Sequence, residues 1–331
     1  MSSSSSSQLG LRLLNQASLI LFAVVLLVFG VLSPAFFQPA NAVNILIQTS
    51  STGILAVGMT FVLLTAGVDL SVGAIMFVAA AVGGKLILGG WSLSGVLVVM
   101  LAIGVVYGAL NALFITRLAI MAFIVTLATR YFGRGLGLRI TETRAMNLPD
   151  SFYELGAARI LGVPLPILIF AGVTLVAHLV LTRTPLGRQI YAVGADVEAA
   201  RKAGINTRGV LFVVYVVCGL CAAAAGIVSL SQAPAVSPSF GNNREFMAIA
   251  AAVLGGTSLF GGRGAVFPGT VLGAVLIQTI ETGLNILNVN SYLYPLIISG
   301  VIFLAVLLDA VRSRVLARVN RRRIFVEAEP T

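Results

Sequence analysis

The chain has 331 residues, of which 58% are hydrophobic and only 10% are charged, and its mean hydropathy is +1.04. A soluble globular protein has roughly a quarter of its residues charged, so this composition excludes a soluble protein and indicates an integral membrane protein. The net charge of +10 does not indicate nucleic-acid binding, because no basic stripe alternates with aromatic residues. We therefore expect membrane lipid, and no nucleic acid, among the partners.

Ten apolar runs have about the length of a membrane span, and backbone groups in lipid must be satisfied internally, so each run is predicted to be a helix. The runs lie at about 17–33, 43–66, 70–88, 93–115, 119–138, 164–182, 210–231, 246–261, 265–288 and 292–311, the eighth being short and bounded by glycines. The serine-rich residues 1–16 are predicted to be a disordered cytoplasmic terminus, 17–311 the transmembrane domain and 312–331 a basic cytoplasmic tail.

Basic residues predict the orientation of the chain. With the N-terminus inside and ten crossings, fourteen of the 21 lysines and arginines fall on the cytoplasmic side and four on the outer side. Loops rich in Lys and Arg stay in the cytoplasm, so both termini and the loop 183–209 are predicted to be cytoplasmic. The long outer loop at about 139–163 is either a docking surface for a soluble partner or a solvated connector.

The stretch "TAGVDLSVGA" interrupts the apolar sequence after the second run with Gly67, Asp69, Ser71 and Gly73. A charged residue within a span is a functional candidate by default, so Asp69 and Ser71 are candidates for the pathway or its gate. The alternative, which we favour, is that the Asp69 carboxylate caps the third helix. Cys218 and Cys221 lie inside an apolar run, where packing is a better interpretation than redox chemistry.

The cytoplasmic loop contains "DVEAARKAG", in which Asp196 is the predicted N-cap of a short helix that Gly204 ends. Such a short helix is marginal alone in water, so it needs either a partner or a membrane surface. Further along, the glycine-rich stretch "LGGTSLFGGRGAVFPG" cannot be a continuous helix. Broken helices of this kind line the pathway in transporters.

Three stretches carry a family resemblance. "EAARKAG" at 198–204, "GILAVGMTFVLLTAGVDLSVGAIM" at 53–76 and "AAAVLGGTSLFGGRGAVFPGTVLGAVLIQTIETGLNILNV" at 250–289 resemble the ribose-type monosaccharide permease subunits of bacterial ABC importers. The resemblance covers about 18–309. It implies an all-α polytopic membrane protein of about ten transmembrane helices, of the ribose/vitamin B12 (type II-like) class, in which 17–311 is the permease domain.

The resemblance also implies the partners and the location. The expected partners are ABC ATPase subunits, a second permease subunit (the same or a related chain) and a periplasmic or extracellular sugar-binding protein, in a bacterial inner membrane. No Gly-x-x-x-x-Gly-Lys-Ser/Thr motif occurs in the chain, so we expect no enzymatic activity and no bound cofactor, with ATP and Mg used by the partner ATPase. The resemblance places contact with that ATPase at Glu198, Ala199, Ala200, Arg201 and Gly204.

A sugar pathway needs hydroxyl and amide side chains, and each candidate could instead make an interhelical hydrogen bond worth about 0.6 kcal/mol. Besides Asp69 and Ser71, the candidates are Asn111, Thr126, Thr257, Gln278, Thr282 and Asn285. Arg134 is expected near the outer head groups, and Arg130 is expected to snorkel or to pair with Glu281. Two rival functions stay open, an ion-driven secondary transporter coupled through Asp69 or Glu281 and a branched-chain amino acid permease; the sequence does not identify the sugar.

Overall fold

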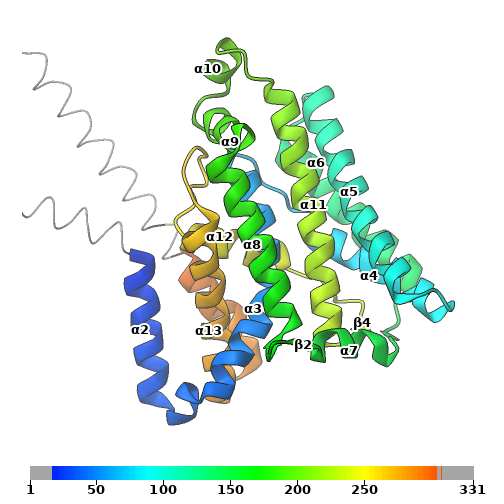
Figure 1. Cartoon of the computed structure of the whole chain (residues 1–331), viewed down its shortest axis with the longest axis vertical. Helices are drawn as coiled ribbons and strands as arrows, with labels where there is room; N and C mark the ends of the chain where they lie inside the picture. The colour runs from blue at the N-terminus through cyan, green and yellow to red at the C-terminus, as the bar shows by residue number, and fades with distance from the viewer. Residues whose placement is uncertain (1–16, 304–306, 308–331) are drawn as a thin grey trace, which may run out of the picture.

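The computed structural model describes residues 17–303 and 307, and within them the chain is almost entirely helical (Figure 1). The helices are α2 (Ala17–Leu32), α3 (Pro39–Leu64), α4 (Val72–Leu88), α5 (Leu93–Arg117), α6 (Ala122–Thr141), α7 (Asp150–Ala157), α8 (Leu165–Arg183), α9 (Pro185–Ala195), α10 (Val197–Lys202), α11 (Thr207–Gln232), α12 (Arg244–Leu254) and α13 (Val271–Ile286). Shorter helical pieces lie at Pro34–Phe37, Val266–Thr270 and Ser291–Leu293, and a last described helix covers Tyr294–Phe303. The predicted termini at 1–16 and 312–331 lie outside the described residues.

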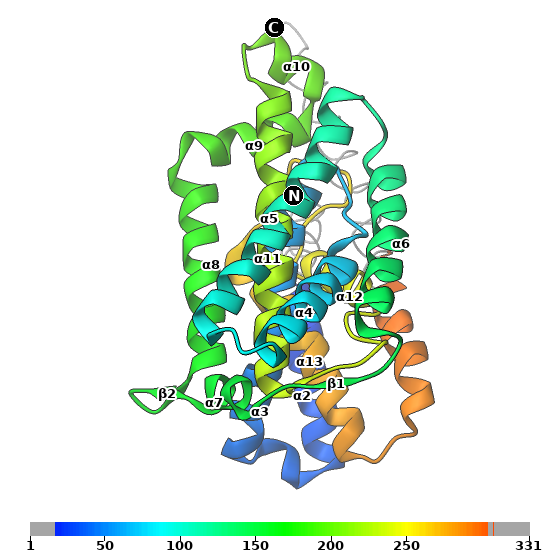
Figure 2. The ribbon, with the colours of Figure 1, turned by 90° about the vertical axis from the view of Figure 1, so that its right-hand side faces the viewer.

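The long helices run along the long axis of the molecule, with α10 at one end and α7 at the other (Figures 1 and 2). Helix α3 lies at the centre and is buried over nearly its whole second half, because α8, α11, α12 and α13 pack around it. The α7 end carries two small antiparallel pairs, β1 (Met146–Asn147) with β4 (Ala235–Val236) and β2 (Arg159–Ile160) with β3 (Val163–Pro164). The predicted outer loop 139–163 thus contains a helix and three of these four strands.

Five of the described helices are long and apolar enough to cross a membrane, and α2, α4 and Tyr294–Phe303 are shorter apolar helices. The predicted count of ten spans is therefore not confirmed. The eighth predicted span is replaced by α12, whose 11 residues extend only about 16 Å, roughly half of the hydrocarbon thickness. Its helix stops at Leu254 because two glycines follow directly.

Glycines allow α5 and α11 to touch through their backbones. A Cβ atom at Gly104 would collide with the carbonyl oxygen of Gly219, and one at Gly108 with that of Tyr215. A second such contact joins α12 to the start of α13, where a Cβ at Gly273 would meet the carbonyl oxygen of Ala251. Small residues thus let the backbones of these helices approach closely.

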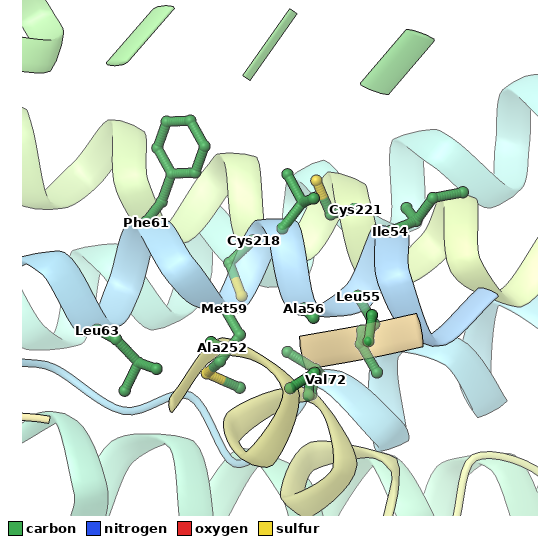
Figure 3. Packing of buried hydrophobic residues seen from close by; sticks show 14 of the residues in the cluster. Ile54, Leu55, Ala56, Met59, Phe61, Leu63, Val72, Cys218, Cys221 and Ala252 are labelled. Carbon is green, nitrogen blue, oxygen red and sulfur yellow. The ribbon is translucent and has the colours of Figure 1, made fainter. Parts of the chain in front are cut away.

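The two cysteines belong to the core that α3 and α11 form (Figure 3). Both are free and buried, and a Cβ at Gly58 of α3 would lie 2.6 Å from the Cβ of Cys221 and 3.2 Å from the Cα of Cys218. Their role is therefore packing, as predicted.

The α5–α11 contact gives a stability prediction. Gly219→Val would place side-chain atoms against the Gly104 carbonyl, so the two helices must separate, and overpacking of this kind costs about 1–3 kcal/mol or more. The free energy of unfolding in detergent micelles measures the loss. Gly172→Val in α8 is the matched control, because no atom lies within 4 Å of a Cβ at that glycine; equal stability of the two variants would contradict the prediction.

Candidate functional site

Helix α10 lies beyond the ends of the long helices, and α9 connects it to the bundle (Figure 1). We call these two helices the α9–α10 unit. The Asp196 carboxylate accepts hydrogen bonds from the backbone N–H groups of Glu198 and Ala199, at 2.9 and 3.0 Å, so it is the predicted N-cap. Gly204 has φ +82, with its N–H bonded to the Arg201 carbonyl and the next N–H to the Ala200 carbonyl. These two bonds form a Schellman motif. Both ends of α10 are therefore fixed by local chemistry.

The exposed surface of α10 contains four of the five predicted contact residues. Glu198, Ala199, Arg201 and Gly204 are exposed, and the Glu198 carboxylate pairs with the Arg201 guanidinium at 2.7 Å. The fifth predicted contact residue, Ala200, is not on this surface, because it is only 4% exposed and packs into the core of its own chain. The helix turns that residue inward, so it positions α10 and contributes no side chain to the exposed surface.

The end of α9 contacts the end of α3 and the glycine-rich loop through backbone atoms. A Cβ at Gly194 would collide with the Leu64 carbonyl oxygen at the end of α3 and would lie 2.7 Å from the backbone nitrogen of Gly262. The Gly262 N–H donates in turn to the Leu64 carbonyl at 2.9 Å. In addition, the Tyr191 hydroxyl donates to the Gly264 carbonyl at 2.8 Å. We call these five residues the α9 junction.

The α9 junction connects the projecting helices to the predicted broken helix. The glycine-rich stretch does leave the helical conformation, at 255–265, and resumes in the short helical piece Val266–Thr270 that leads into α13. Burial raises the pKa of the Tyr191 hydroxyl above its ordinary value, so this group stays protonated and able to donate. The end of α9 is thus in direct contact with the end of α3 and with the loop before α13.

Four predicted pathway residues come together near the start of α4. Asp69 Oδ1 accepts from the Ser71 N–H at 2.9 Å and from the Ser71 hydroxyl at 2.6 Å, and the Asn111 amide donates to that hydroxyl at 2.8 Å. Thr126 approaches the Val68 carbonyl at 3.4 Å. Asp69 lies two residues before the N-cap of α4, which is Ser71. Its carboxylate thus binds a backbone N–H at the start of α4, as the capping interpretation predicts, although the residue directly before the helix is Ser71.

A buried ion pair joins α6 to α12. The Arg130 guanidinium lies 2.6 Å from Glu245 Oε1, and the Glu245 side chain is 2% exposed. Glu245 is in the first turn of α12, and a Cβ at Gly73, near the start of α4, would lie 2.6 Å from its second carboxylate oxygen. The carboxylate is thus held near two helix N-termini, which favour negative charge. The predicted pair of Arg130 with Glu281 is wrong; Glu281 interacts electrostatically with Arg244.

Arg134 binds the non-helical segment that leads into α12. Its guanidinium donates to the carbonyls of Pro238 and Phe240 and lies 4.4 Å from the centroid of the Phe77 ring. Non-helical backbone inside a membrane is tolerated where protein satisfies its polar groups. Arg134 therefore holds the segment that leads into α12, and its depth near the outer head groups stays a prediction.

The remaining predicted pathway residues lie apart from this cluster. Gln278 and Thr282 are neighbours on α13, and the Gln278 amide donates to Gln48 on α3 at 2.8 Å. Thr257 is buried in the glycine-rich loop, with Gly264 packed against it. Asn285 is exposed near the end of α13. The eight predicted residues therefore belong to separate regions. Side-chain hydrogen bonds join Asp69, Ser71 and Asn111 in one group and Gln278 with Thr282 in another.

Glu245, Tyr191 and Gly194 were not among the predicted site residues. One signal for Glu245 is in the sequence, because "NNREFM" places an acid beside a base directly before an apolar run. Tyr191 and Gly194 have no such signal, since their partners in the fold, the backbone groups of Gly264, Leu64 and Gly262, are far away along the chain.

Comparison with known proteins gives one family. Residues 41–307 match the model described as "Branched-chain amino acid transport system / permease component". The "Ribose import permease protein RbsC" of Escherichia coli (strain K12) is 40% identical over 304 residues, which cover 90% of this chain and 94% of that protein. The "D-allose transport system permease protein AlsC" of the same strain is 37% identical (89% and 91% covered), and the "Xylose transport system permease protein XylH" is 32% identical (92% and 94%). No solved structure matches the chain.

Proposed function

Because this chain belongs to the family of permease components of the branched-chain amino acid transport system type, we propose that it is the membrane-spanning subunit of an ATP-driven importer that takes up a monosaccharide. The single observation that supports a sugar as the cargo is the set of relatives whose names specify ribose, D-allose and xylose. These relatives are 32–40% identical to this chain over about nine tenths of its length. The family description alone would favour an amino acid as the cargo.

The α9–α10 unit supports docking of an ATPase subunit. Its exposed residues Glu198, Ala199, Arg201 and Gly204 lie beyond the bundle, where a cytoplasmic protein can reach them. ATP and Mg are used by that partner. The closure of two ATPase subunits would press on α10, and the α9 junction would transmit the displacement to the loop 255–265 and the end of α3. The permease itself carries out no covalent chemistry.

The orientation and the other partners belong to the same proposal. The α10 end faces the cytoplasm with both termini, and the α7 end, with its loop 139–163, faces a periplasmic or extracellular sugar-binding protein. A second permease subunit, the same chain or a related one, completes the pathway in the bacterial inner membrane. The basic residues concentrated at 183–208 support this orientation.

Uptake by proteoliposomes tests the function. The permease, reconstituted with its ATPase subunit and its sugar-binding protein, is expected to import radiolabelled D-ribose, D-allose or D-xylose only when ATP is enclosed with the ATPase. Omitting the binding protein is the control and should lower uptake at least tenfold. Import of leucine but no sugar would indicate the amino acid permease, and import driven by an ion gradient without ATP would indicate a secondary transporter; either result refutes the proposal.

A further inference from the structure

Arg130 lies at the middle of α6, which has 20 residues, and its side chain is still 22% exposed despite the ion pair with Glu245. A charged side chain at the centre of a bilayer is costly, and such residues face protein or a water-filled cavity. We expect the exposed part of this side chain to face water, because lipid chains offer a guanidinium no hydrogen-bond acceptors.

The depth of this pair follows from its neighbours on α12 and α3. Arg244, which precedes Glu245, donates to the hydroxyl of Thr52 at 3.1 Å, and Thr52 is halfway along α3. Helix α12 thus begins at mid-depth, where the non-helical segment before it ends. Arg134 already attaches α6 to that non-helical segment. The partly exposed Arg130 is therefore not needed to hold α6 in place.

An aromatic ring completes the exposed surface. The Arg130 guanidinium carbon lies 5.6 Å from the centroid of the Phe246 ring, which is 48% exposed. Arginine supplies several fixed N–H donors, the carboxylate supplies acceptors, and the ring supplies a flat apolar face. A polyhydroxy sugar presents hydroxyl groups that both donate and accept, together with apolar C–H faces. The three side chains match this chemistry.

We infer that Arg130, Glu245 and Phe246 form a contact site for a monosaccharide at the middle of the membrane, on a face of α6 and α12 that borders a water-filled pathway. The inference rests on the proposed function and adds to it the residues that meet the sugar. Glu245 lies beside the Asp69–Ser71–Asn111 cluster, since a Cβ at Gly73, two residues after Ser71, would lie 2.6 Å from its carboxylate.

Thiol labelling tests whether the face is wet. In a chain carrying Cys218→Ala and Cys221→Ala, a membrane-impermeant thiol reagent is applied to the reconstituted complex with Phe246→Cys or with Leu175→Cys. Leu175 is the matched control, because it is at the middle of α8 and 58% exposed. We expect Phe246→Cys to react at least tenfold faster. Equal rates would overturn the inference.

Transport by charge-removed variants tests contact with the sugar. Arg130→Gln alone leaves a buried carboxylate unpaired and is expected to reduce assembly, so the decisive variant is Arg130→Gln/Glu245→Gln, which removes both charges together and leaves no unpaired carboxylate. This double variant is expected to assemble and to retain binding-protein-stimulated ATP hydrolysis within twofold, yet to import D-ribose, D-allose or D-xylose at least tenfold more slowly. Import at the unmodified rate would assign the pair to structure alone.

These experiments distinguish an error in the proposed function from an error in the proposed contact site. If the unmodified complex imports none of the three sugars, the proposed function itself is wrong. If it imports sugar normally while Phe246→Cys labels no faster than Leu175→Cys, the function stands and the contact site is wrong.

Discussion

Gly204→Asn will leave the chain folded and inserted and will lower ATP-driven uptake at least tenfold. Asparagine tolerates the left-handed backbone that Gly204 adopts at φ +82, so the Schellman motif persists. No atom of the chain lies within 4 Å of a Cβ at this position, so the new side chain enters space that only a docked partner would occupy. Uptake and ATP hydrolysis by the reconstituted complex are the measurements, with binding of the ATPase subunit measured by co-purification.

Gly90→Asn is the control for this experiment. Gly90 has φ +86, and again no atom lies within 4 Å of its Cβ, but it follows α4 near the α7 end. Its substitution has the same backbone cost, and because Gly90 is far from α10 it should leave co-purification of the ATPase subunit and ATP hydrolysis within twofold of the unmodified values. If both variants transport equally well, α10 is not a docking surface and the membrane-interface alternative for this helix gains support.

Local features of the sequence predict the fold well where the chain interacts with itself over a few residues. Asp196 and Gly204 were identified as the two ends of a short helix because a cap and a C-terminal glycine act within one turn. The glycine-rich break before α13 was predicted for the same reason, since glycine weakens a helix wherever it stands. Ala200 was misplaced because its neighbours on other elements, and not its own turn, decide which side of α10 is covered.

Charged partners within the membrane could not be predicted in this way. By its sequence, Arg130 can pair with any acid at its depth, and the predicted partner is Glu281. In the fold, Glu245 lies next to Arg130. Glu245 is deep because α12 is a short helix that begins inside the bundle. A hydropathy pattern cannot distinguish such a short helix from a full membrane span. The family resemblance supplied the function, whereas the placement of the ion pair and of the α9 junction required the three-dimensional arrangement.

Gly194→Ala should uncouple ATP hydrolysis from transport. Its Cβ would collide with the Leu64 carbonyl oxygen, so α9 must move away from the end of α3 and from Gly262. The exposed residues of α10 are unchanged, so the ATPase subunit is expected to bind and to hydrolyse ATP. Without the backbone contact, its motion no longer reaches the loop 255–265, and we expect uptake per ATP hydrolysed to fall at least tenfold.

A milder variant separates transmission from local misfolding. Tyr191→Phe adds no volume and removes only the hydrogen bond to the Gly264 carbonyl, which typically contributes about 0.5–1.5 kcal/mol. We expect it to lower uptake per ATP by about two- to fivefold while lowering the free energy of unfolding by no more than about 0.5–1.5 kcal/mol. Gly135→Ala, where no atom lies within 4 Å of the Cβ, should have no effect. Full coupling in both α9 variants would mean that force from the ATPase reaches the pathway by another route, through α11, which follows α10 directly in the chain.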